Sequence, residues 1–148
     1  MTAPPATRLP PTRRLGDVHV GDELPELAIE VTPTLVIAGA FASRDLTRVH
    51  HDKTDAQARG LQDVIMNTLT TNGLVSRFVT DWAGPEAVVR RLHLKLGAPN
   101  LPGDTMKLTA TVRAVDEGGA VVSLEIAGTN AWGKHVTGTV ELVLPKGV

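Results

Sequence analysis

The chain has 148 residues, a length that suits one domain with its own hydrophobic core and is short for two. Apolar residues make up 42% and charged residues 21%, and the interspersed acids and bases leave a net charge of −1, so we expect a soluble globular protein with no electrostatic preference for nucleic acid or for an anionic membrane. Cysteine is absent, which excludes a disulfide framework, a thiol nucleophile and a Cys-ligated metal within this sequence.

The pattern of apolar residues gives no reason to expect a membrane protein or a secreted one. The longest apolar run, residues 35–42, is far shorter than the roughly 20 residues that a membrane-spanning helix needs. The first residues do not join a basic end to an apolar stretch, as a secretion signal does. We therefore expect a cytoplasmic location.

The first 16 residues, MTAPPATRLPPTRRLG, hold four of the ten prolines and three arginines. Proline removes backbone donors and interrupts regular hydrogen-bond ladders, so the sequence predicts a disordered tail over residues 1–16 and a single domain over residues 17–148.

Helical patterns occupy the middle of the chain, after a short strand predicted over residues 24–31. Residues 34–43 (TLVIAGAFAS) suit either a buried helix or a buried strand, and we favour the helix. A further short helix is predicted over residues 55–59. The clearest helix covers residues 65–82, because its large apolar residues recur at helical spacing until Gly84-Pro85 stops it.

The last 60 residues change to period-two alternation. Four strands are predicted over residues 88–96, 105–115, 120–129 and 135–144, with turn signals between them. His93 and His135 fall in these strands and are expected at the surface or at an interface. A long helix needs a sheet to bury it, so we predict an α+β fold in which one antiparallel sheet wraps around a single central helix.

The segment SRDLTRVHHD concentrates polar chemistry immediately before the central helix. A carboxylate and an imidazole that face one water molecule, here Asp45 and His50, can supply the base and the acid for adding water across a conjugated double bond. The spacing alone favours a turn-forming aspartate and a packed or surface histidine over a catalytic pair. A metal site at His50, His51 and Asp52 is disfavoured, because three adjacent residues rarely converge on one ion.

Three motifs in register resemble one known family. ASRDLTRVHHD, GLQDVIMNTLTTNGLV and LKLGAPNLPGDTMKLTATV are similar, in order and spacing, to the signature segments of the MaoC-like (R)-specific enoyl-CoA hydratases. The resemblance implies a single hot-dog fold. Residues 49–85 most resemble the small MaoC-domain subunit of actinobacterial hydratases that degrade steroid side chains, such as that of cholesterol.

The resemblance also assigns roles to residues of this chain. Asp45 and His50 match the family's catalytic pair, and Thr68 matches the glycine whose backbone N–H polarises the thioester carbonyl. Asn67, which stands where the family has histidine, is expected to cap the helix. Ser76 matches a serine that supports the catalytic aspartate in some members.

Partners and cofactors follow from the same resemblance. We expect an acyl-CoA substrate, a larger MaoC-domain subunit in a heterodimer or heterotetramer, and no cofactor or metal apart from the CoA of the substrate. Two alternatives stay open: a stand-alone homodimeric hydratase or 3-hydroxyacyl dehydratase of fatty-acid metabolism, and a hot-dog subunit without catalytic activity.

Overall fold

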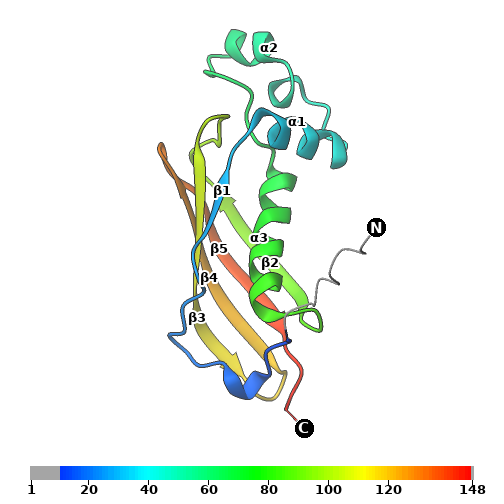
Figure 1. Ribbon diagram of the computed structural model, residues 1–148, viewed down its shortest axis with the longest axis vertical. Helices are drawn as coiled ribbons and strands as arrows, with labels where there is room; N and C mark the ends of the chain where they lie inside the picture. Colours follow the sequence, from blue (N-terminus) through cyan, green and yellow to red (C-terminus); the bar gives the residue numbers. More distant parts are fainter. Residues whose placement is uncertain (1–10, 148) are drawn as a thin grey trace, which may run out of the picture.

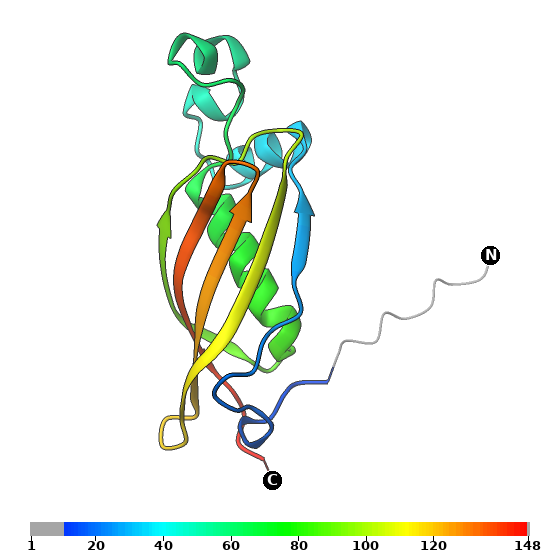
Figure 2. The same ribbon diagram turned by 90° about the vertical axis from the view of Figure 1, so that its left-hand side faces the viewer.

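A five-stranded antiparallel sheet curls around one long helix in the computed structural model, which describes residues 11–147 (Figures 1 and 2). The strand order is β1-β3-β4-β5-β2. The elements along the chain are η1 (Leu15–Asp17), β1 (Leu27–Glu30), α1 (Pro33–Ala42), η2 (Arg48–His50), α2 (Lys53–Ala58), α3 (Thr68–Ala83), β2 (Val88–Leu96), β3 (Thr105–Asp116), β4 (Val121–Asn130) and β5 (Gly133–Val143). This is the single hot-dog fold that the sequence predicted.

The core lies between α3 and the inner face of the sheet. Along β3 every second residue from Met106 to Val112 is buried, and the neighbouring strands alternate in the same phase because antiparallel partners directly opposite share a face. These side chains pack on the buried face of α3, which presents Val75, Phe78 and Val79. Apolar and polar residues alternate in the sequence because the sheet buries one face only.

The helices begin where the sequence offers capping groups. Thr32 accepts a hydrogen bond from the Leu35 N–H at 3.0 Å and starts α1, which confirms a helix in place of the alternative strand. α3 starts three residues later than predicted. Ile65 and Met66 are held outside the helix, because their N–H groups donate to Val49 O and Asn100 O. No helix in the described part of the chain is long and apolar enough to span a membrane.

The predicted disordered tail needs a correction. Residues 1–10 lie outside the described residues, but residues 11–16 are bound to the domain. The Arg13 N–H donates to Ala83 O at 2.8 Å, and the Arg13 guanidinium lies 4.8 Å from the centre of the Trp82 ring. Leu15 is buried and donates its N–H to Pro145 O. Proline content alone could not reveal these contacts, because they join segments far apart in the sequence.

α1 crosses α3 where a glycine permits close approach. A side chain at Gly39 would overlap the Thr70 side chain, including its Oγ1 atom. The Gly39 carbonyl also accepts a hydrogen bond from Ser43 Oγ, two residues before Asp45. The contact therefore fixes the end of α1 that leads into the segment with Asp45.

Replacing Gly39 tests this contact. Gly39→Ala should lower the free energy of unfolding by about 1–3 kcal/mol, because the new methyl group overpacks against Thr70. Gly73→Ala is the matched control: Gly73 lies within α3 with open space where the methyl group would stand, so the change should be neutral or slightly stabilising. Urea unfolding of both variants measures the difference. Equal stability of Gly39→Ala and the unmodified chain would contradict the close packing.

Candidate active site

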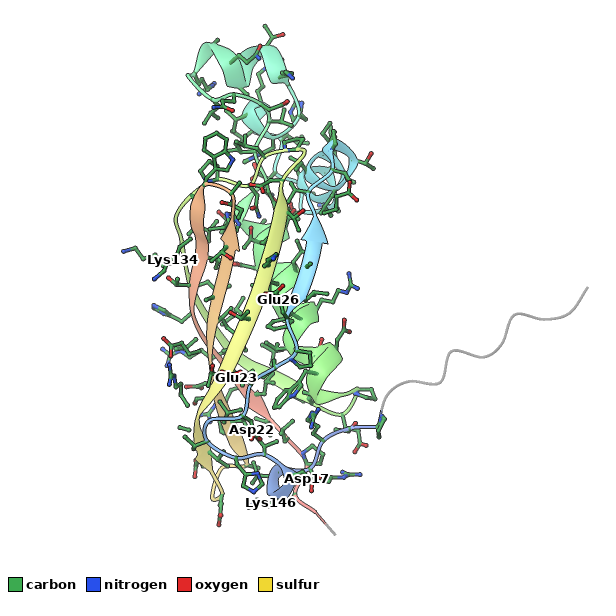
Figure 3. The ribbon with its side chains drawn as sticks, turned by 60° about the vertical axis from the view of Figure 1, so that its left-hand side comes forward. Asp17, Asp22, Glu23, Glu26, Lys134 and Lys146 are labelled. Carbon is green, nitrogen blue, oxygen red and sulfur yellow. The ribbon has the colours of Figure 1, made fainter. Side chains whose placement is uncertain are left out.

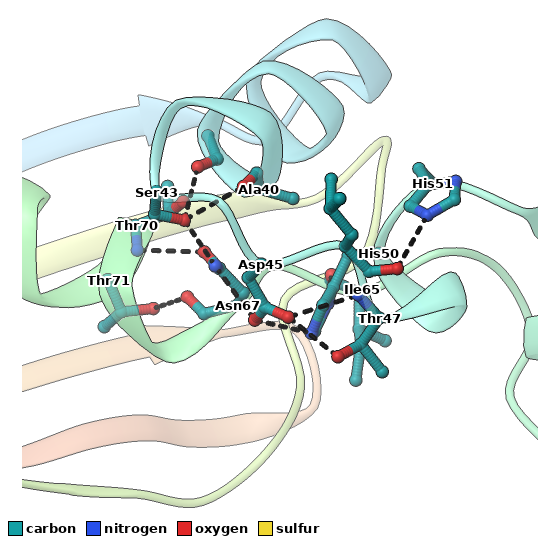
Figure 4. Close-up of polar contacts among 12 residues, drawn as sticks. Ala40, Ser43, Asp45, Thr47, His50, His51, Ile65, Asn67, Thr70 and Thr71 are labelled. Carbon is teal, nitrogen blue, oxygen red and sulfur yellow. Dashed lines mark hydrogen bonds and ion pairs between the residues drawn. The ribbon is translucent and has the colours of Figure 1, made fainter.

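The segment of residues 43–52 follows α1, and its first residues lie beside the N-terminal end of α3, where Asn67 contacts Ser43 and Asp45 (Figure 4). Ser43 Oγ donates to Gly39 O and Ala40 O and so satisfies carbonyls at the end of α1. Arg44 follows with a φ of 58°, in the left-handed region that often ends helices. The Asp45 N–H then donates to Ala40 O at 2.9 Å, which sets the position of the aspartate.

Asp45 and His50 face each other across 3.3 Å, measured from Asp45 Oδ2 to His50 Nε2. On the other side of the ring, His50 Nδ1 lies 2.7 Å from Ile65 O. A carbonyl oxygen only accepts, so Nδ1 carries a proton, and in the neutral tautomer the ring presents its lone pair at Nε2. In that tautomer two acceptors face each other, and a water molecule in contact with both could donate one hydrogen to each.

Three donors hold the Asp45 carboxylate. Thr47 donates to Oδ1 through Oγ1 at 2.7 Å and through its N–H at 3.3 Å, and Asn67 Nδ2 donates to Oδ2 at 3.1 Å. These hydrogen bonds lower the pKa of Asp45 below its ordinary value, chiefly through the Thr47 hydroxyl and next through Asn67, while partial burial opposes them. Asp45 is therefore ionised at neutral pH.

Asn67 links the carboxylate to the central helix. Its Oδ1 accepts the Thr70 N–H at 2.9 Å, the N-cap interaction that the sequence predicted. Its Nδ2 donates to Ser43 Oγ at 2.8 Å as well as to Asp45. Thr68 is the first residue of α3, so its backbone N–H has no acceptor within the helix and lies at the positive end of the helix dipole.

A buried polar network beneath this site was missed by sequence reasoning. His135 was expected at the surface or an interface, and that prediction is wrong, because its side chain is buried on β5. Its Nδ1 lies 2.6 Å from Ala98 O and its Nε2 lies 2.9 Å from Thr71 Oγ1 on α3. Burial lowers the pKa of His135, so the ring is neutral and ties the first turn of α3 to the sheet.

Period-two alternation placed His135 on the wrong face for a local reason. The pairing of β4 with β5 shifts register between Gly128 and Thr129, which pair with Val136 and Lys134 respectively. His135 is the extra residue of this bulge and turns inward. No sequence signal marked the bulge, so simple alternation failed here.

Ser76 does not support Asp45 as the family resemblance implied. Within residues 11–147, the donors to the Asp45 carboxylate are Thr47 and Asn67. Ser76 lies nine residues beyond Asn67 along α3, which at about 1.5 Å per residue is about 13 Å further along the helix axis. Ser43, a site residue that the sequence did not single out, takes part in the hydrogen-bond chain instead.

The neighbouring polar residues have structural partners. Asp52 caps α2 by accepting the Asp55 N–H at 3.1 Å, and His51 Nε2 lies 3.1 Å from Leu46 O while its ring packs against Phe41. Among residues 11–147, no group of three or more His, Cys, Asp or Glu side chains is arranged to hold a metal ion.

A groove of about 650 Å³ runs along the far end of α3, lined by Trp82, Phe78 and the segment around Arg13. It contains neither Asp45 nor His50. Asp45 and His50 are only partly exposed, with side-chain exposures of 28% and 12%.

The sequence of this chain is similar to those of known proteins. A model of the family described as MaoC like domain matches residues 19–131. The 3-oxo-4,17-pregnadiene-20-carboxyl-CoA hydratase beta subunit of Mycobacterium tuberculosis is 45% identical over 123 residues, which cover 83% of this chain and 94% of that subunit.

Solved structures agree with this match. A chain of the ChsH1–ChsH2 complex from Mycobacterium tuberculosis is 43% identical, with a TM-score of 0.82 over 85% of this chain and 98% of that one. The R-hydratase PhaJ1 from Pseudomonas aeruginosa, at 20% identity and a TM-score of 0.83, covers 90% of this chain and 86% of its own, and shares the fold.

The Thr47 hydroxyl offers a direct test of the electrostatics. Thr47→Val keeps the shape of the side chain but removes the strongest donor to Asp45, so the charged form is less favoured and the pKa of Asp45 should rise. Thr54→Val, on the exposed face of α2, is the control and should leave it unchanged. Carbon-13 NMR titration of the Asp45 carboxyl group reports the pKa. An unchanged or lower value in Thr47→Val would contradict the assignment.

Proposed function

This chain belongs to the MaoC-like domain family, and on that premise we propose that it is the catalytic subunit of a heteromeric hydratase that adds water across the α,β-double bond of a bulky enoyl-CoA thioester. Its family and its 45% identical hydratase relative make it a hydro-lyase. The observation that carries the catalytic assignment is the pair of facing acceptors, Asp45 Oδ2 and His50 Nε2.

In the proposed reaction, His50 acts as the base. Its unprotonated Nε2 takes a proton from a water molecule that contacts both side chains, and the water oxygen forms a bond to Cβ of the substrate. The π electrons of the double bond move toward the thioester, and the charge gathers on its carbonyl oxygen. The His50 imidazolium then delivers a proton to Cα, so that the elements of one water molecule have been added.

Asp45 has the complementary role. Because its hydrogen bonds keep the pKa low, it is suited to orient the water and to stabilise the His50 imidazolium rather than to carry the proton itself. The Thr68 N–H, at the positive end of α3, is our candidate donor for the enolate-like oxygen. This chemistry uses no cofactor and no metal.

The substrate and the partner are inferred from the relatives. We propose a CoA ester of a steroid with an unsaturated side chain, because the 45% identical relative is a 3-oxo-4,17-pregnadiene-20-carboxyl-CoA hydratase subunit. We propose a larger MaoC-domain subunit as partner, because the 43% identical chain is solved in a two-protein complex. The exposed apolar side chains of Phe41, Leu46 and Leu69 support an acyl pocket that a second subunit completes.

Substitution of the pair tests the proposal in the assembled enzyme. Asp45→Asn and His50→Ala should each lower turnover of 3-oxo-4,17-pregnadiene-20-carboxyl-CoA by about 10²- to 10⁴-fold, because the first removes the charge that stabilises the His50 imidazolium and the second removes the group that transfers the proton. Loss of the enoyl-thioester absorbance measures turnover. Full activity in either variant would refute the assigned site.

The chain contains a matched control pair. His19 and Asp22 also lie together, 3.9 Å apart, but they are exposed and Asp22 lies at the end of the molecule opposite α1 and α2 (Figure 3). His19→Ala and Asp22→Asn should leave turnover unchanged. Rapid hydration of crotonyl-CoA by the isolated chain would favour the stand-alone hydratase over the heteromer.

A further inference from the structure

β2 is the long free edge of the sheet within residues 11–147. In the order β1-β3-β4-β5-β2, the two end strands have a neighbour on one side only, and β1 has four residues against nine in β2. β2 pairs with β5 from Val88↔Val143 to Leu96↔Val136, so the backbone groups on its other side have no strand partner. Such an edge readily accepts a strand from another chain.

The outer face of this edge carries a row of basic side chains. Arg91, His93 and Lys95 face solvent and alternate with three half-buried leucines that pack toward α3. Lys134, on the adjoining strand, also projects away from the sheet (Figure 3). We call Arg91, His93 and Lys95 the basic row.

The charges that face the basic row within this chain do not neutralise it. Glu141 is opposite Arg91 in the β2–β5 register and lies 4.0 Å from Arg90, so it offsets part of the charge at one end. His93 and Lys95 are opposite Thr139 and Thr137, which carry no charge. On the next strand, Glu125 is already engaged by Arg113.

Antiparallel geometry makes the basic row a barrier to self-pairing. Residues directly opposite each other in an antiparallel pair lie on the same face. If two copies of this chain paired along the full length of β2 about a two-fold axis, the basic row of one copy would lie opposite the basic row of the other. With His93 at the axis, Arg91 of each copy would face Lys95 of its mate, and like charges directly opposite destabilise the pair.

We propose that the basic row selects the edge strand of a second hot-dog subunit that carries carboxylates on its outer face, and that it disfavours pairing with a second copy of this chain. The inference rests on the heteromeric assembly proposed above. It adds that opposite charges on the two edge strands distinguish the partner subunit from a second copy of this chain. Pairing of this kind extends the sheet across the two subunits and buries the free edge of β2. The basic row then forms cross-strand ion pairs with the carboxylates of the partner.

A charge-reversed version of this same chain can stand in for the acidic partner. The variant Arg91→Glu/His93→Glu/Lys95→Glu changes exposed side chains only, so the fold should persist. Sedimentation equilibrium at low salt should find both the unmodified chain and the variant monomeric, whereas an equal mixture should form a 1:1 dimer. The mixed dimer should have a dissociation constant at least about tenfold lower than that of either self-associated form.

Three further measurements make the outcome decisive. Lys107→Glu/Arg113→Glu reverses charges on the same outer face but on the interior strand β3, and it should not dimerise with the unmodified chain. Salt of about 1 M, where the Debye length falls to about 3 Å, should weaken the mixed dimer. If the triple variant does not fold, Arg91→Glu/Lys95→Glu replaces it.

Two results would overturn the proposal. One is a stable dimer of the unmodified chain at low salt. The other is a mixture that stays monomeric, which would mean that the basic row only protects an exposed edge against aggregation. Neither result measures turnover, so a failure here is distinguishable from a failure of the hydratase proposal, which the Asp45 and His50 variants test.

Discussion

The side chain of Asn67 is the interaction on which the arrangement depends. One amide group caps α3 through its oxygen and, through its nitrogen, holds both Ser43 and the Asp45 carboxylate. The position of the Asp45 carboxylate is thereby tied to the helix that fills the core. Because the amide is almost fully buried, water cannot replace these hydrogen bonds, and their loss would leave unsatisfied polar groups in the interior.

The sequence predicted the fold well and the site in part. Period-two runs located β2 to β5 because one face of the sheet is buried, and family motifs paired Asp45 with His50 correctly in space. The burial of His135 was not predicted, because a bulge turns its side chain to the inner face of the sheet. Ser76 was wrongly placed next to Asp45, because a match between sequence motifs gives no information on distance. The sequence assigned no role to Thr47, and only the folded loop reveals that its hydroxyl holds Asp45.

An isolated chain of this shape leaves two surfaces incomplete. Near the catalytic pair, the apolar side chains of Phe41, Leu46 and Leu69 are each more than half exposed, an unfavourable arrangement for a lone chain in water. Along the sheet, β2 offers an unpaired edge. A second subunit together with a large acyl group would cover both, which is why we connect the catalytic proposal with a heteromer.

The proposed chemistry requires an unprotonated Nε2 on His50, which faces Asp45 because Nδ1 donates to Ile65 O. Nitrogen-15 NMR of the histidine-labelled chain, at a pH where the imidazole is neutral, measures this directly, with the His50 signal identified by its loss in His50→Ala. The account predicts a protonated Nδ1 and a bare Nε2 for His50. A proton on Nε2 with a bare Nδ1 would contradict it, because the ring would then have no lone pair to accept a proton from water.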